Sequence, residues 1–149
     1  MRARKTILPA ISTLFLLVLS YQALLAQSKL QQELHQGWKF HEAGKEAWYP
    51  ASVPGCVHVD LMNNNVISDP FYRDNEQKLQ WIGKTDWEYA TVFQVPAEIL
   101  SRQHIELVFE GLDTYARAYL NGVLVIDADN MFREWRAGCK SLLKPSDND

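Results

Sequence analysis

The sequence predicts a single all-β sandwich domain, because strand-like segments follow one another at short spacing along the second half of the chain. The clearest segment is 87–95, where aromatic and β-branched residues occupy every second position, as in a half-buried strand. A second indication is Asn121-Gly122, which separates two further strand-like segments and is typical of a tight hairpin turn. These features predict a sandwich with one long insertion at 48–86.

The predicted strands lie, in chain order, at 38–40, 87–95, 104–110, 115–120, 123–127 and 132–137. Pro96 ends the second of these strands, since proline cannot donate to a central ladder. In the third strand Ile105, Leu107 and Phe109 share one face, which we expect to be the buried one. The fourth and fifth strands form the hairpin across Asn121-Gly122.

The 48–86 insertion is rich in proline and asparagine, and its only regular pieces are predicted helical turns at 57–62 and 76–82. Long loops of this kind in a compact domain are usually functional or form a packed interface. We therefore expect candidate site residues in this insertion.

The N-terminus has the layout of a secretory signal peptide. Basic residues in 1–5 precede an apolar run over 7–19, and small residues end the segment at Ala26. An alternative is a membrane anchor, but about thirteen apolar residues fall short of the roughly 20 needed to span a bilayer. We therefore expect residues 1–26 to be a signal peptide and 27–149 to be the domain, exported to the periplasm or secreted, or lysosomal if the source is eukaryotic.

Composition excludes several classes of partner. The chain carries a formal net charge of −3, and removal of the basic leader makes it more acidic. This argues against nucleic acid or anionic membrane as partner, because both need a basic surface. The His and Cys residues show no metal-ligand spacing, so no metal or cofactor is predicted. Cys56 and Cys139 are expected to be free thiols, although export would permit a disulfide.

Short sequence blocks along the domain resemble those of one enzyme family. They are Gly37-Trp38-Lys39-Phe40, Val53-Pro54-Gly55-Cys56, Ile67-Ser68-Asp69-Pro70, Asp74-Asn75-Glu76, Trp81-Ile82-Gly83, Asp86-Trp87-Glu88-Tyr89, Phe109-Glu110-Gly111-Leu112-Asp113, Leu120-Asn121-Gly122 and Asn130-Met131-Phe132. In this order and spacing they resemble the opening of the β-mannosidase branch of family 2 glycoside hydrolases.

The resemblance implies a jelly-roll β-sandwich similar to galactose-binding domains, followed in the complete enzymes by immunoglobulin-like domains and a (β/α)₈ barrel. Two barrel glutamates remove terminal non-reducing β-D-mannose with retention of configuration. A barrel alone takes roughly 250 residues, so no catalytic residue is assigned here and the chain alone is expected to be inactive. Its implied partners are the remaining domains of the parent enzyme and, through the complete active site, β-mannoside oligosaccharides. Residues 144–149 fall where the family turns into another strand, so we expect the sandwich to be truncated at its C-terminal end.

Three residues of the 69–81 loop are predicted to contact substrate, namely Asn75, Glu76 and Trp81. Aromatic faces beside hydrogen-bonding groups are the mixture that sugar sites use. The alternative is packing against another domain, which we favour for the loop's aromatic residues. A catalytic role for Glu76 is rejected, because no apolar strand leads into it.

Three other tryptophans, Trp48, Trp87 and Trp135, are expected in the core rather than as sugar platforms. Two further functions stay open beside the mannosidase one: a stand-alone carbohydrate-binding module, and the same domain of an exo-β-glucosaminidase or β-galactosidase. The absence of an evident exposed aromatic strip counts against the binding module. A plain interaction domain is a third alternative.

Overall fold

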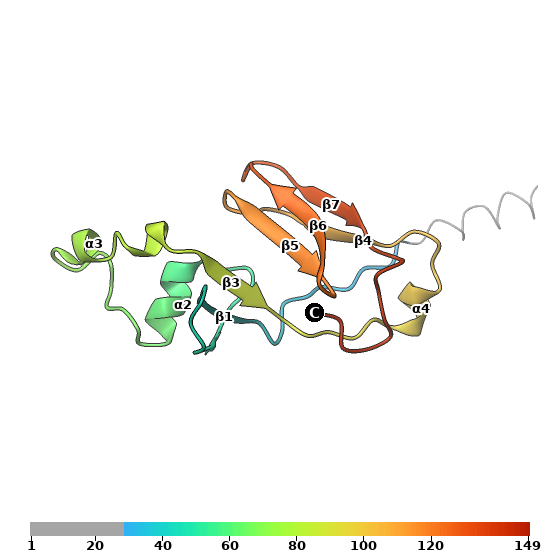
Figure 1. Ribbon diagram of the computed structural model, residues 1–149, viewed down its shortest axis with the longest axis horizontal. Coiled ribbons are helices and arrows are strands. Elements are labelled where there is room, and N and C mark those ends of the chain that lie inside the picture. The colour runs from blue at the N-terminus through green and yellow to red at the C-terminus, as the bar shows by residue number, and fades with distance from the viewer. Residues whose placement is uncertain (1–28) are drawn as a thin grey trace, which may run out of the picture. The chain divides into compact units, whose positions relative to one another are not determined.

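The computed structural model describes residues 29–149, so the predicted signal peptide, 1–26, lies outside the described residues. Residues 33–149 form one compact unit of short strands with a few helical turns (Figure 1). The strands are β1 (Lys39–Glu42), β2 (Tyr49–Pro50), β3 (Trp87–Ala90), β4 (Glu106–Phe109), β5 (Ala116–Leu120), β6 (Val123–Ala128) and β7 (Trp135–Gly138). The helices are α2 (Val57–Asn63), α3 (Asn75–Lys78) and α4 (Ala97–Leu100), with a 3₁₀ turn, η1 (Ile82–Lys84).

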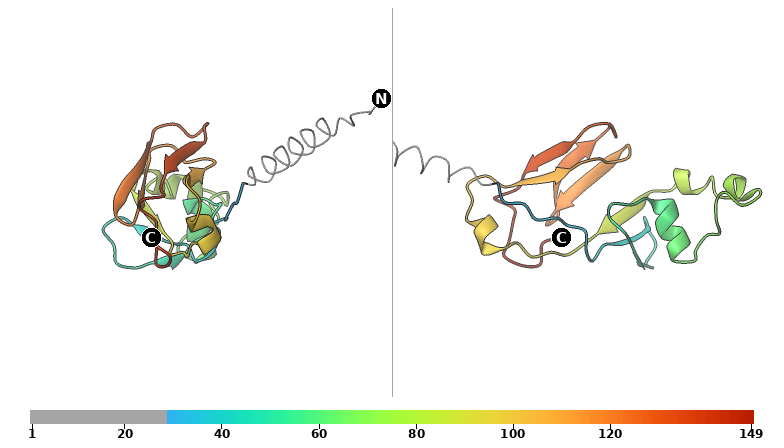
Figure 2. Two further views of the ribbon diagram at one scale, coloured as in Figure 1. Left: turned by 90° about the vertical axis from the view of Figure 1, so that its right-hand side faces the viewer. Right: turned by 180° about the vertical axis from the view of Figure 1, so that it is seen from behind.

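The strands form three antiparallel sheets, ordered β2-β1-β3, β4-β7 and β5-β6. Figures 1 and 2 both show the β5-β6 hairpin alongside the β4-β7 pair, and β6 contacts β7. The sheets stay open and do not close into a barrel. The all-β prediction is therefore confirmed, with short helices confined to the connections.

The core of the first sheet is built on Phe40, which is fully buried together with Leu61 of α2 and Ile82 of η1. The ring of Phe40 stacks on Tyr89 at 5.4 Å and is tilted against Trp87 at 5.8 Å. The insertion thus supplies two of the three fully buried residues of this core. Burying three large apolar side chains stabilises the unit by about 1.5–3 kcal/mol each.

The predicted strand 87–95 is confirmed in its faces but not in its length. Burial alternates as expected as far as Val95, yet the ladder to β1 ends where Lys39 pairs with Ala90. Beyond that point Phe93 forms a single bridge with Asn148, and its amide donates to the Asn148 carbonyl at 2.9 Å. The strand is shorter because β1 offers no further partner.

The hairpin prediction is confirmed. Asn121 and Gly122 have φ values of 51° and 80°, the two positive values that a type I′ turn requires. The register of β5 and β6 shifts between Ala118 and Tyr119, which marks a bulge in the ladder.

The last strand begins later than predicted, at Trp135 instead of Phe132. The Phe132 amide donates to the Asn130 side chain at 2.8 Å in a local turn, and Phe132 is 89% exposed. Such side-chain turns compete with strand pairing. Arg136 of β7 then pairs across the sheet with Glu106 of β4 at 3.1 Å.

The secondary structure between residues 48 and 105 differs in part from the predictions. The β2 strand and the α4 helix were not predicted, because β2 has only two residues and α4 only four, which is too short for a recognisable sequence pattern. The predicted helical turn at 76–82 is divided between α3 and η1. Within residues 29–149, no helix is long and apolar enough to cross a membrane.

The 144–149 segment is held in place by Asn148, whose side chain is fully buried. Its carbonyl oxygen accepts from the Asn121 amide at 3.0 Å and from the Lys144 backbone at 2.8 Å. Its amide group donates to the Lys144 carbonyl at 2.8 Å. This segment therefore connects the continuation of β3 with the β5-β6 turn.

Candidate functional site

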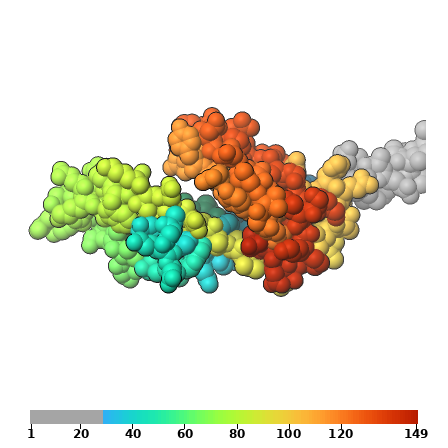
Figure 3. Space-filling view, in the orientation of Figure 1, coloured from blue at the N-terminus to red at the C-terminus, as the bar shows by residue number. Residues whose placement is uncertain are grey.

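The 69–81 loop presents the aromatic residues that the sequence analysis singled out. Phe71 is 96% exposed, Tyr72 is 57% exposed and Trp81 is 39% exposed. In Figure 3 the loop forms the green left-hand end of the surface. A side chain as apolar as Phe71 is costly to leave in water, so the loop has the character of a contact surface.

Hydrogen bonds within the loop fix its shape. The Asp69 carboxylate accepts from the Phe71 amide at 2.9 Å, and the Asp69 carbonyl accepts from the Asn75 side chain at 2.8 Å. Arg73 lies over the Tyr72 ring at 5.0 Å and has a positive φ of 55°. A non-glycine residue in that region is uncommon and persists where its surroundings hold it.

The predicted site residues Asn75 and Glu76 begin the four-residue helix α3. The Asn75 amide group is committed to the loop, whereas the Glu76 carboxylate is exposed and makes no hydrogen bond or ion pair with the described residues. Glu76 is therefore the group of this loop with most capacity to bind an external donor. The Asp74 carboxylate beside it is paired with Lys78 at 3.1 Å.

The third predicted residue, Trp81, precedes η1 and is anchored on the core. Its ring lies 5.9 Å from that of Trp87, tilted by 46°, so one part of the indole is covered and the rest faces solvent. Among residues 29–149, no hydrogen bond, ion pair or ring contact links Trp81 with Asn75 or Glu76. The structure thus places the three residues on one loop without joining them into a preformed pocket.

The core assignment of the other tryptophans is correct for one of them. Trp87 packs on Phe40 and donates its indole N–H to the Ile82 carbonyl at 3.1 Å. Trp48 is instead 43% exposed, with its ring stacked on His41. Trp135 is half-buried, with Arg133 4.3 Å from its ring centre. The sequence could not predict how the three tryptophans differ in exposure, because a tryptophan indicates burial in general and not the exposed fraction of its ring.

Sequence reasoning also missed a pair of exposed aromatics on the β5-β6 hairpin. Tyr115 is 86% exposed and Tyr119 is 51% exposed. Tyr115 directly precedes β5 and Tyr119 lies within it. Every second residue from 115 to 119 is exposed, so both tyrosines lie on the uncovered face. The alternating pattern of 115–120 signalled the strand but did not show that this face stays uncovered.

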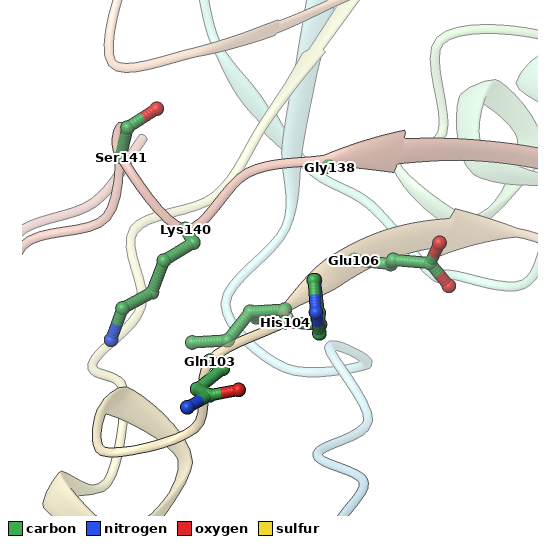
Figure 4. Close-up of a pocket in the computed structure, with 7 residues that line it drawn as sticks. Gln103, His104, Glu106, Gly138, Lys140 and Ser141 are labelled. Carbon is green, nitrogen blue, oxygen red and sulfur yellow. The ribbon is translucent and has the colours of Figure 1, made fainter.

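A depression of about 340 Å³ lies beside the β4-β7 pair, lined by residues 103–106, Gly138, Lys140 and Ser141 (Figure 4). The Lys140 ammonium donates to the Leu100 carbonyl, and Figure 4 shows the Glu106 carboxylate directed away from Gln103 and His104. Binding pockets need polar groups that converge. These diverge, and no group of acidic, His or Cys side chains among residues 29–149 is arranged to hold a metal.

Both cysteines are free thiols, with Cys56 exposed and Cys139 buried. Burial raises the pKa of the Cys139 thiol above its ordinary value. The Cys139 thiol is therefore protonated and unreactive at neutral pH.

The chain is similar to β-mannosidases in sequence and in structure. It is 38% identical over 122 residues to a β-mannosidase of Bos taurus, covering 82% of this chain and 14% of the relative. It is 42% identical over 109 residues to β-mannosidase B of Aspergillus terreus, covering 70% of this chain and 13% of the relative. The crystal structure of β-D-mannosidase from Dictyoglomus thermophilum matches with a TM-score of 0.76 and 44% identity, over 78% of this chain and 14% of that one.

The chain spans about 14% of the length of these relatives, so the comparison concerns one domain of a much longer protein. Residues 38–149 match the family profile described as the glycosyl hydrolase 2 galactose-binding domain-like family. That match includes every strand of the described residues, from β1 to β7, and it agrees with the open sheets of the fold. The chain therefore belongs to the glycosyl hydrolase 2 galactose-binding domain-like family.

Proposed function

We propose that residues 27–149 are the non-catalytic N-terminal domain of an exported glycoside hydrolase that removes terminal non-reducing β-D-mannose. The observation that carries this proposal is the likeness to β-mannosidases in both sequence and structure. The chemistry belongs to two glutamates of a separate barrel domain, and this domain supports that barrel and contributes a loop to its site. The remaining domains are its partners.

Within this function, the 69–81 loop supplies Asn75, Glu76 and Trp81 to the rim of the substrate site. The exposed Glu76 carboxylate is suited to accept hydrogen bonds from sugar hydroxyls, and the open part of the Trp81 indole is suited to pack against a sugar face. Phe71 and Tyr72 pack against a neighbouring domain. An aromatic surface of that size would otherwise remain in water.

Glu76 does not act as the acid/base of a retaining mechanism. Such a site holds two carboxyl groups about 5 to 5.5 Å apart around the sugar. The Asp74 carboxylate, two residues away, is committed to Lys78 in an exposed ion pair. A rim contact made in both the ground state and the transition state raises KM when lost and leaves kcat unchanged.

The test uses the complete enzyme with an aryl β-mannoside as substrate. Glu76→Gln and Trp81→Ala are each expected to raise KM several-fold with kcat retained. Glu110→Gln is the matched control, since Glu110 is an exposed glutamate directly after β4. A kcat that falls by orders of magnitude in Glu76→Gln would contradict the rim assignment, and unchanged kinetics would show that the loop only packs.

Export through residues 1–26 is the remaining part of the proposal, with a secreted or periplasmic destination, or a lysosomal one in a eukaryote. The basic start and short apolar run support it. Mass spectrometry of protein from the culture medium or the periplasm should find Gln27 as the first residue. An intact Met1 in exported protein would contradict cleavage.

A carbohydrate-binding module is a second candidate function, and one observation favours it. Tyr115 and Tyr119 form the exposed aromatic pair that the sequence did not reveal. Calorimetry of the isolated chain with manno-oligosaccharides separates the two functions. Binding of manno-oligosaccharides with a millimolar or lower Kd that is lost in Tyr115→Ala would favour the carbohydrate-binding module. No binding would favour the non-catalytic domain of a larger hydrolase.

A further inference from the structure

A histidine in the first sheet is held by two acceptors and one aromatic ring. His41 of β1 is 8% exposed. Its Nδ1 lies 2.5 Å from the Lys45 carbonyl oxygen, and its Nε2 lies 2.8 Å from a Glu88 carboxylate oxygen. The Trp48 ring stacks on the imidazole with 3.7 Å between ring centres and 21° between planes.

The two hydrogen-bond partners decide which form of the imidazole fits. A carbonyl oxygen and an ionised carboxylate can only accept hydrogen bonds. Neutral imidazole has one N–H, so it would turn a lone pair toward one of these oxygens. The imidazolium donates from both nitrogens and satisfies both partners. Its charge is also favoured over an indole face.

The elements packed around His41 differ in the charge that they bring to it. Glu88 of β3 lies directly opposite in the sheet register, and its side chain is 61% exposed. The β2 neighbours, Tyr49 and Pro50, carry no charge at neutral pH, and Trp48 precedes them. On its own strand, Lys39 and Glu42 are exposed or half-exposed at the strand ends. Lys45 and Glu46 of the 43–48 turn are exposed, and neither side chain forms an ion pair with His41. Glu88 is therefore the charged side chain in direct contact with His41.

We propose that His41, Glu88 and Trp48 form a proton-dependent clasp that ties the 43–48 turn to β3. With the proton bound, the imidazolium bridges the Lys45 carbonyl and Glu88 while Trp48 covers its face. When the proton leaves, one of the two hydrogen bonds is lost, and the turn carrying Trp48 is released from the sheet. The clasp is distinct from the proposed sugar rim on the 69–81 loop.

The direction of the pH dependence follows from the same contacts. The hydrogen bond to Glu88 raises the pKa of His41 above its ordinary value, against the opposing effect of burial. A histidine whose pKa is higher in the folded state stabilises the fold most at pH values below its unfolded pKa, roughly 6.5. That stabilisation is lost as the pH rises through the folded pKa. The turn should therefore open on the alkaline side.

Nuclear magnetic resonance of the 149-residue chain tests the clasp directly. Long-range proton–nitrogen correlations distinguish an imidazolium from either neutral tautomer. We expect His41 to be an imidazolium at pH 6, and the Trp48 indole resonance to shift over the pH range in which His41 loses its proton. A His41 that is a neutral tautomer at pH 6, or a Trp48 resonance that does not change when His41 is deprotonated, would overturn the proposal.

Substitution of the partner gives a second test that does not threaten the fold, because Glu88 faces solvent. Glu88→Gln keeps an acceptor and removes the charge, so the His41 pKa should fall while the Trp48 stack persists at acid pH. Glu110→Gln is the control and should leave the His41 titration unchanged. An unaltered His41 pKa in Glu88→Gln would refute the role of Glu88. An equal shift in both variants would show that only net charge matters.

Discussion

Removal of the buried Asp60 carboxylate should be among the most destabilising single changes in the domain. Asp60 is 1% exposed on α2. One of its carboxylate oxygens accepts from the Ser52 backbone amide at 2.9 Å, and the other accepts from the Tyr89 hydroxyl at 2.9 Å. It therefore joins the helix, the preceding loop and β3 at one point.

The magnitude follows from these two bonds. A hydrogen bond to a charged group contributes about 1.5–3 kcal/mol, so the pair contributes about 3–6 kcal/mol. Tyr89 is half-buried and regains some water when its partner is lost, so we expect the lower part of this range, about 3–4 kcal/mol, for Asp60→Ala. The total free energy of unfolding of a domain is about 5–15 kcal/mol, so the loss expected for Asp60→Ala is a large share of it.

Asp60→Asn should cost less, about 1–2 kcal/mol. The amide oxygen can still accept from the Ser52 amide, and the amide NH₂ can donate to the Tyr89 oxygen, because a phenol also accepts. The structure thus predicts the order wild type, Asp60→Asn, Asp60→Ala in decreasing stability.

Urea unfolding of the chain and its variants provides the assay, with Tyr89→Phe completing a double-mutant cycle. We expect a coupling energy between Asp60 and Tyr89 of about 1–2 kcal/mol, within the range for residues in contact. Burial, followed by the hydrogen bond to Asp60, raises the pKa of Tyr89, so tyrosinate should form at lower pH in Asp60→Ala. A loss below about 0.5 kcal/mol in Asp60→Ala, typical of a surface substitution, would refute this reasoning.

Three further outcomes are expected. Asn148→Ala should lower the free energy of unfolding by about 2–4 kcal/mol in urea titrations, because buried groups lose their partners; no change would mean that the 144–149 segment is dispensable. Gly122→Ala should cost about 1–2 kcal/mol through strain at φ +80°, whereas Gly83→Ala, with open space and no positive φ, should be neutral. An aromatic disulfide reagent should modify Cys56 in the native chain and Cys139 only after unfolding; equal rates would contradict the burial.

Local signals carried most of what the sequence predicted correctly. The φ values at Asn121 and Gly122 depend on two adjacent residues, so the hairpin could be predicted from them alone. The burial alternation from Trp87 to Val95 is also local, because it follows from the strand period. The end of the β3 ladder at Ala90 could not be predicted, since it depends on where the antiparallel strand β1 begins.

The candidate site shows the same division. Composition and family resemblance located the 69–81 loop, and the exposed Phe71 agrees with a contact surface. The hydrogen bond from Asn75 to the Asp69 carbonyl was not predictable, because it depends on how the loop folds back. The position of Trp48 on His41 depends likewise on strand pairing between β1 and its neighbours.

Hydrolysis of an aryl β-mannoside is the measurement that tests the central claim most directly. If the domain supports a catalytic barrel without carrying the acid/base or the nucleophile, the isolated chain should release no more phenol than a heat-denatured control, while the complete enzyme turns over. Glu76→Gln in the isolated chain should then change nothing. Turnover by the isolated chain that Glu76→Gln abolishes would place catalysis in this domain and contradict the account.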